Sequence, residues 1–115
     1  MAMKIEEKEI TPGLVVITIT GRVTLNEPTV EIEKAVSRLS GENKRNLIFD
    51  LSGVTHIDST GIGRFISSLN SLRQAGGRLR MAGATGQVRD SFRVTRLDTI
   101  FAFDEDLEAA LKAAG

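Results

Sequence analysis

One stretch of this chain decides its fold: LIFDLSGVTHIDSTGIG, residues 47–63. Its nearly continuous apolar start, residues 47–51, predicts a central strand that is covered on at least one face. A helix is expected next, over residues 61–75, with an apolar stripe made of Ile62, Phe65, Ile66, Leu69 and Leu72. The junction between the two places Ser59 at the positive end of a helix, where negative charge is tolerated and backbone N–H groups are free.

Two strands and a helix are expected before this stretch. Residues 4–10 are mostly charged and predict a weak edge strand, whereas residues 14–20 are rich in β-branched side chains and predict a strong one. Turn residues at 11–13 join them into a hairpin. We expect Gly21 to end the second strand, Asn26 to cap a helix with Glu27 and Pro28 in its first turn, and Gly41 to close that helix. Its buried stripe consists of Ile32, Ala35, Val36 and Leu39.

Two further strands and two further helices are expected after it. Residues 78–82 alternate like a strand, and a short helical segment follows with Val88 and Phe92 one turn apart. Residues 100–103 predict a final strand, and Asp104 caps a last helix. This order predicts an α/β fold, a mixed sheet of about five strands with four helices packed on it and right-handed crossovers. Nothing repeats and no linker breaks the chain, so we expect one domain over residues 1–115.

Composition narrows the classes of function. Hydrophobic residues make up 41% of the chain, enough for one core without disulfides. The absence of cysteine rules out a thiolate metal site, and the single histidine, His56, rules out a site built on two imidazoles. Fifteen basic residues balance fifteen acidic ones, so no net charge draws the chain to nucleic acid. No apolar run is long enough to span a bilayer and residues 1–9 are polar and charged, so we expect a soluble, cytoplasmic protein.

The start of the predicted second helix is the richest candidate for chemistry. Asp58, Ser59 and Thr60 supply three oxygen-bearing side chains, and Gly61 and Gly63 remove side-chain bulk next to them. A phosphate on Ser59 would meet the amides of the helix N-terminus, although Asp58 would repel it. The simpler alternative is that these residues only cap the helix, which is what their types most often do, and that the glycines only allow close packing.

Other motifs of catalysis and binding are missing. The third glycine of a dinucleotide fingerprint is replaced by Ile66, and no G-x-S-x-G elbow exists. His56 is close enough in sequence to act as a base for Ser59, but it reads more simply as a loop or strand-end residue. The spacing of Arg89, Arg93 and Arg96 allows a small basic stripe on one helix face, for an acidic partner or as ordinary surface.

These residues resemble a known family. LIFDLSGV at residues 47–54, followed by IDSTGIG at residues 57–63, is similar to the signature of bacterial anti-sigma-factor antagonists of the STAS family. The entry hairpin, Gly21, the Gly76 and Gly77 pair, and the segment FAFD at residues 101–104 agree in order, so the resemblance covers essentially the whole chain.

The resemblance implies a mechanism. The unphosphorylated antagonist binds an anti-sigma factor that is also a serine kinase of the histidine-kinase-like ATPase type, and this frees a sigma factor. The kinase phosphorylates Ser59 with ATP and magnesium, and a PP2C-type phosphatase reverses the modification. The chain is then a substrate and switch rather than an enzyme, without a cofactor or metal of its own. The implied partner surface comprises Thr24, Asn26, Asp58, Ser59, Thr60, Gly61, Ile62 and Gly63.

The chain departs from the family pattern at two positions. Thr24 stands where family members often carry an acidic residue near the switch serine, and Arg96 stands where a glycine is usual, between Thr95 and Leu97. The first departure leaves open an alternative function, a constitutive STAS interaction module that is not phosphorylated. An enzymatic alternative, a small serine hydrolase using Ser59 and His56, lacks the elbow motif.

Overall fold

The computed structural model describes residues 2–115, and Met1 lies outside the described residues. Over residues 2–115 the chain forms one five-stranded sheet in the order β1-β2-β3-β4-β5, four α-helices and a 3-10 turn, η1. Strands β1 and β2 are antiparallel, and the remaining pairs are parallel. The predicted fold class is therefore confirmed. The elements are β1 (Lys4–Thr11), β2 (Leu14–Val23), α1 (Val30–Gly41), β3 (Asn46–Ile57), α2 (Ser59–Gln74), β4 (Arg78–Ala82), α3 (Gly86–Val94), η1 (Leu97–Thr99), β5 (Ala102–Asp104) and α4 (Leu107–Ala114).

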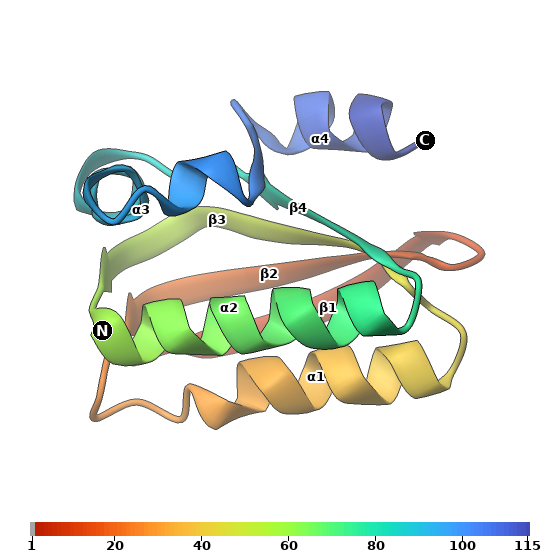
Figure 1. Ribbon diagram of the computed structural model, residues 1–115, viewed down its shortest axis with the longest axis horizontal. Helices are drawn as coiled ribbons and strands as arrows, with labels where there is room; N and C mark the ends of the chain where they lie inside the picture. Colours follow the sequence, from red (N-terminus) through yellow and green to blue (C-terminus); the bar gives the residue numbers. More distant parts are fainter. Residues whose placement is uncertain (1) are drawn as a thin grey trace.

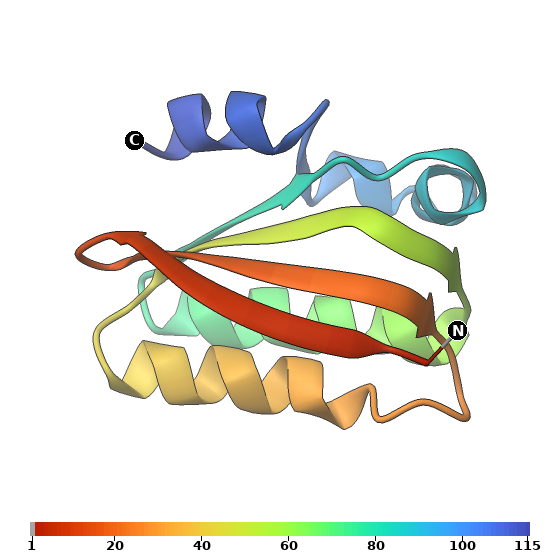
Figure 2. The same cartoon turned by 180° about the vertical axis from the view of Figure 1, so that it is seen from behind.

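Helices cover the two faces of the sheet unequally. Helices α1 and α2 lie side by side on one face, while α4 lies on the opposite side of the sheet near β4 (Figures 1 and 2). Alternation along β2 explains this, because Val15 and Ile17 point into the main core and Leu14 and Val16 point toward α4. No helix among residues 2–115 is long and apolar enough to cross a membrane.

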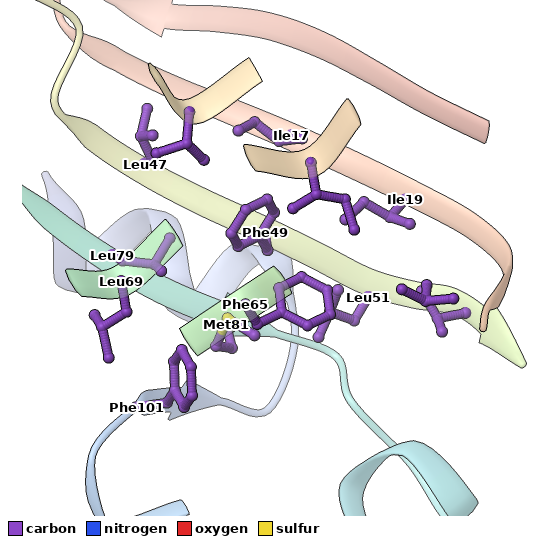
Figure 3. Close-up of a cluster of buried hydrophobic side chains, with 14 of the residues drawn as sticks. Ile17, Ile19, Leu47, Phe49, Leu51, Phe65, Leu69, Leu79, Met81 and Phe101 are labelled. Carbon is purple, nitrogen blue, oxygen red and sulfur yellow. The ribbon is translucent and has the colours of Figure 1, made fainter. Parts of the chain in front are cut away.

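The main core sits between the sheet and the α1–α2 layer. Figure 3 shows aliphatic side chains of three neighbouring strands converging on Phe49 and Phe65. The rings of these two phenylalanines meet edge to face, with centroids 5.1 Å apart. Phe92 of α3 continues the aromatic cluster, 6.0 Å from Phe65 and 5.5 Å from Phe101. Edge-to-face contacts of this kind favour a fixed packing of α2 and α3 against the strands.

Strand β3 is longer than predicted and projects beyond the end of its neighbour β4. It pairs with β2 up to Val23 and Ile57, whereas its pairing with β4 ends at Asp50. A β-carbon on Gly53 would lie 2.7 Å from Thr20 Cγ2, so the glycine permits this close continuation along β2. The projecting end of β3 carries residues 58 and 59 to the carboxyl edge of the sheet.

The predicted boundaries around α1 were wrong. Gly21 does not end β2; it lies inside the strand with φ of 88°, and the strand continues to Val23. Asn26 does not cap α1, which begins at Val30 with Thr29 at its N-cap position. The physical reason is Pro28, because a residue before proline avoids the helical region and a helix through Glu27 is disfavoured.

Other helix ends also differ from the predictions. The helix α1 includes Gly41, and the left-handed residue that follows it is Asn43, with φ of 63°. The helix α3 ends at Val94, and Arg96 lies beyond it in a left-handed conformation, so the predicted arginine stripe is interrupted. Arg89 packs instead over the ring of Phe103, 4.0 Å from its centroid.

Asp104 does not cap the last helix. The last strand begins at Ala102, later than predicted, and Asp104 is its final residue. The Asp104 carboxylate accepts two hydrogen bonds from the Arg80 guanidinium, at 2.7 and 3.0 Å. Asp106 is the cap of α4, because its Oδ1 accepts a hydrogen bond from the Ala109 N–H at 2.8 Å. The ion pair holds the short edge strand β5 against β4.

Candidate functional site

The strand β3 ends directly at a capped helix start. Asp58 is the N-cap of α2: its Oδ1 accepts a hydrogen bond from the Gly61 N–H at 3.1 Å. Its Oδ2 accepts a second one from the Leu25 N–H at 2.9 Å, and its own N–H donates to the Val23 carbonyl at 3.4 Å. Asp58 therefore ties the start of α2 to the chain that leaves β2.

Ser59 is the first residue of α2 and is exposed. Capping is done by Asp58, and within residues 2–115 the Ser59 hydroxyl makes no hydrogen bond. The backbone N–H groups of Ser59 and Thr60 also have no protein acceptor in that part of the chain, as expected for the first turn of a helix. The first turn carries no acidic residue, so the positive end of the helix dipole is offset only by the cap. A hydroxyl with free amides beside it is the arrangement that accommodates an added anion.

The two glycines of the segment have different roles. A β-carbon on Gly61 would lie 2.3 Å from the Val23 carbonyl oxygen and 2.9 Å from Ile57 Cγ1, so α2 approaches the end of β2 as closely as the backbone allows. A β-carbon on Gly63 would have nothing within 4 Å. Close packing therefore explains Gly61 and does not explain Gly63.

The loop after β2 is hydrogen-bonded to Asp58, the residue before Ser59. Thr24 and Asn26 belong to a tight turn closed by the Glu27 N–H, which donates to the Thr24 carbonyl at 2.9 Å. Leu25, between them, is bonded to Asp58 through its N–H, and its side chain is 70% exposed. Sequence reasoning missed Leu25, although an apolar residue between two polar ones in a loop was a usable signal.

A shallow, mostly apolar groove lies on the other flank of Ser59. It separates the start of α2 from α3 and has a volume of about 560 Å³. Ile62 lines it, whereas Arg64 turns away and donates to Thr29 Oγ1 and Glu33 Oε1 of the α1 region. Val94, at the far wall, is 82% exposed. The lining residues are Ile57, Asp58, Ser59, Ile62, Gly86, Gln87, Asp90, Ser91, Val94 and Thr95.

A comparison with protein families decides what kind of domain this is. The family model of the STAS domain matches residues 6–110 of the sequence. The chain belongs to the STAS domain family. The resemblance noted in the sequence is thereby confirmed, and the exposed Ser59 lies in the segment that carried it.

Relatives of this STAS domain include proteins named as anti-sigma factor antagonists. The anti-sigma-B factor antagonist of Staphylococcus aureus strain NCTC 8325 is 27% identical over 78 residues, which cover 68% of this chain and 72% of the relative. The crystal structure of an anti-sigma factor antagonist from Mycobacterium paratuberculosis superposes with a TM-score of 0.84 at 20% identity, over 98% of this chain and 94% of that one. The Bacillus cell fate determinant SpoIIAA in its phosphorylated form gives 0.74 at 18% identity, over 96% and 99%. At these identities the two structures establish the shared fold.

Neither a catalytic base nor a set of metal ligands is found at the Ser59 hydroxyl among residues 2–115. The His56 ring is exposed and its Nδ1 lies 3.1 Å from Thr55 Oγ1, with no hydrogen bond to Ser59. Within residues 2–115 no cluster of three histidine, aspartate or glutamate side chains is arranged to hold a metal ion. The chemistry that the site itself offers is therefore an accessible hydroxyl at a helix N-terminus.

Proposed function

We propose that this STAS domain is an anti-sigma factor antagonist that works by partner switching. In the unphosphorylated state it binds an anti-sigma factor that is also a serine kinase of the histidine-kinase-like type, and this frees a sigma factor. The kinase transfers the terminal phosphoryl group of ATP to Ser59 Oγ, and a PP2C-type phosphatase removes it. The exchange takes place in the cytoplasm, and the domain is a substrate and switch rather than an enzyme.

The observation that carries the proposal is that Asp58, and not Ser59, caps the helix α2. Asp58 caps α2 with one carboxylate oxygen and holds Leu25 with the other, so the helix start is complete without the neighbouring hydroxyl. The Ser59 hydroxyl is exposed and unbonded in the part of the chain described, and is thus accessible to a kinase. This favours a modification site over the simple capping role that its residue type suggests.

The surroundings of Ser59 explain how a phosphate would end binding. Leu25 and Val94 expose apolar side chains on opposite flanks of Ser59, and the apolar groove begins beside it. A phosphate adds a charge of about −1.5 to −2 at neutral pH. Burying that charge in an apolar contact is costly, so an interface centred on Ser59 dissociates when the serine is modified.

Thr24 supports one alternative, a constitutive interaction module that is not phosphorylated. Its side chain is uncharged where related antagonists often carry an acid, and its carbonyl oxygen closes the turn beside Asp58. In that alternative the same surface binds a partner regardless of the charge at residue 59.

Binding by charge variants tests the proposal. We expect Ser59→Ala to bind a histidine-kinase-like anti-sigma factor from the same genome as tightly as the unphosphorylated wild type, and Ser59→Asp to bind at least tenfold more weakly, since about 1.4 kcal/mol of charge burial suffices. Ser67→Asp is the matched control, because Ser67 is also an exposed serine of α2 but lies two turns away. Equal affinity of the alanine and aspartate variants at position 59 would support the constitutive module instead.

A further inference from the structure

The projecting end of β3, residues 51–57, has no partner strand on the side of β4 within the described part of the chain. On one side the end of β3 is bonded to β2, where the Asp58 N–H donates to the Val23 carbonyl. On the other side β4 stops at Ala82, opposite Asp50. Successive residues of a strand direct their N–H and C=O groups to opposite sides, so both groups of Ile57 point to the side that β4 does not reach. Ile57 is buried, and unpaired backbone groups there would be destabilising.

A single side chain takes the place of the missing strand. Gln87, the second residue of α3, accepts a hydrogen bond from the Ile57 N–H at 2.9 Å through Oε1 and donates one to the Ile57 carbonyl at 3.0 Å through Nε2. The same Nε2 also donates to Ser91 Oγ at 2.7 Å, and that hydroxyl donates to the Gln87 carbonyl at 2.8 Å. Both protons of the amide are thus used, which fixes its orientation. A carboxylate of the same shape would lack both donors.

This contact joins α3 to the residues that precede Ser59. The helix α3 is anchored in the main core through Val88 and Phe92, which are fully buried. Ile57 is held by α3, and the next residue, Asp58, is held by β2 and by the Leu25 N–H. The backbone leading to Ser59 is therefore held from both flanks, and Gln87 is the contact on the α3 side.

We propose that Gln87 is the positioning residue for the Ser59 segment, fixing the end of β3 so that Asp58 can cap α2 and hold Leu25. Two amides that Gln87 does not touch report on this role, the N–H groups of Gly61 and Leu25, because both donate to Asp58. If Gln87 only stabilised α3, replacing it would not lower the hydrogen-exchange protection of these two amides relative to amides at the centre of the sheet. The expected effect on partner binding rests on the function proposed for Ser59.

Hydrogen exchange on the full chain tests the proposal with two variants of nearly unchanged size. Gln87→Glu keeps the acceptor and loses both donors, and Gln87→Met loses all hydrogen bonding. In both we expect the protection of the Ile57 amide to fall about tenfold or more, because Gln87→Glu loses the two bonds that Nε2 donates and Gln87→Met also loses the one that Oε1 accepts. Protection of the Gly61 and Leu25 amides falls with it, while that of Phe49 in the centre of β3 stays within about twofold.

Controls separate a local effect from a general one. Gln74→Glu makes the same chemical change at an exposed position at the end of α2 and leaves all four amides unchanged. Ser91→Ala removes one support of the Gln87 amide and gives a smaller fall in the same direction. Wild-type protection at Gly61 and Leu25 in both Gln87 variants would overturn the proposal, and so would an equal fall at Phe49.

A kinase assay then distinguishes this proposal from the function proposed for Ser59. With a histidine-kinase-like anti-sigma factor, ATP and magnesium, we expect Gln87→Glu to be phosphorylated several-fold more slowly than wild type and Gln74→Glu at the wild-type rate. Phosphorylation of Gln87→Glu at the wild-type rate would overturn the positioning role. If no candidate kinase modifies the wild type, the function proposed for Ser59 fails, and the exchange pattern alone decides the role of Gln87.

Discussion

Replacing Gly61 by alanine places a methyl group where the structure has no room for it. The new carbon would lie 2.3 Å from the Val23 carbonyl oxygen, 2.8 Å from Val23 Cγ1 and 2.9 Å from Ile57 Cγ1. The nearest of these is a main-chain atom of a paired strand, so a side-chain rotation cannot relieve the contact. The start of α2 must move away from the end of β2, and this weakens the hydrogen bond from the Asp58 N–H to Val23.

The size of the effect follows from two opposing contributions. Overpacking of this kind costs about 1–3 kcal/mol, with the upper part of the range expected for a main-chain contact. Alanine regains up to about 1 kcal/mol over glycine through its higher helix propensity. We therefore expect Gly61→Ala to lower the free energy of unfolding by about 2 kcal/mol. With a urea dependence of about 1.5 kcal/mol per M, the midpoint of unfolding falls by about 1.3 M.

Gly63 provides the matched control, two residues further along α2. A β-carbon there meets nothing within 4 Å, so Gly63→Ala gains helix propensity without a clash and raises stability by up to about 1 kcal/mol. Urea unfolding followed by far-ultraviolet circular dichroism measures both variants. If Gly61→Ala were as stable as Gly63→Ala, the close approach of α2 to β2 would be refuted as the reason for the glycine.

Three other substitutions test separate contacts. Asp58→Ala removes the cap of α2 and should cost about 1 kcal/mol in urea unfolding, with loss of exchange protection at the Leu25 amide; an unprotected Leu25 amide in the wild type would contradict the contact. Leu25→Ser should change the free energy of unfolding by less than about 0.5 kcal/mol but weaken binding to the anti-sigma factor several-fold. The control Ile10→Ser, an exposed apolar residue at the other end of the sheet, should leave binding unchanged. Equal effects of the two variants on binding would show that Leu25 is not part of the partner surface. Arg80→Gln breaks the two hydrogen bonds to Asp104 and should cost about 1–3 kcal/mol. An arginine is charged through neutral and mildly alkaline pH, and the hydrogen bond to Asp104 raises the pKa of Arg80 further, so the cost should be the same at pH 7 and pH 9.

The parts of the fold that follow from residue type and the spacing of apolar side chains were predictable. The β-branched residues at 14–20 and the apolar run at 47–51 correspond to the strands whose side chains fill the core in Figure 3. Helical spacing likewise predicted the buried faces of α1 and α2, including Ile32 and Phe65. Buried positions are occupied by apolar residues, so the pattern of apolar residues along a short segment of sequence indicates which face is buried.

Boundaries were harder because backbone geometry sets them. Gly21 was read as a stop, but in a left-handed conformation it continues β2 for two more residues. Asn26 and Asp104 are both good cap residues by type, yet one lies in a turn before Pro28 and the other is held by Arg80. In each case a neighbouring residue or a distant partner overrides the propensity of the residue itself.

The candidate site divides in the same way. The place of Ser59 at a helix start follows from the strand and helix patterns on either side of it. Three features do not follow, because they join segments far apart in the sequence: Leu25 on Asp58, Val23 against Gly61, and Gln87 on Ile57, which lies 30 residues away. The assignment of capping to Asp58, which leaves the hydroxyl of Ser59 free, required the contacts themselves.

The most direct test of the central claim is the intact mass of the protein after reaction with candidate kinases. The wild type and Ser59→Ala are incubated with each histidine-kinase-like anti-sigma factor of the same genome, with ATP and magnesium. We expect one added phosphate on the wild type with one of these partners and none on the variant. A stable complex with no added phosphate, or a phosphate that Ser59→Ala also acquires, would contradict the switch at Ser59.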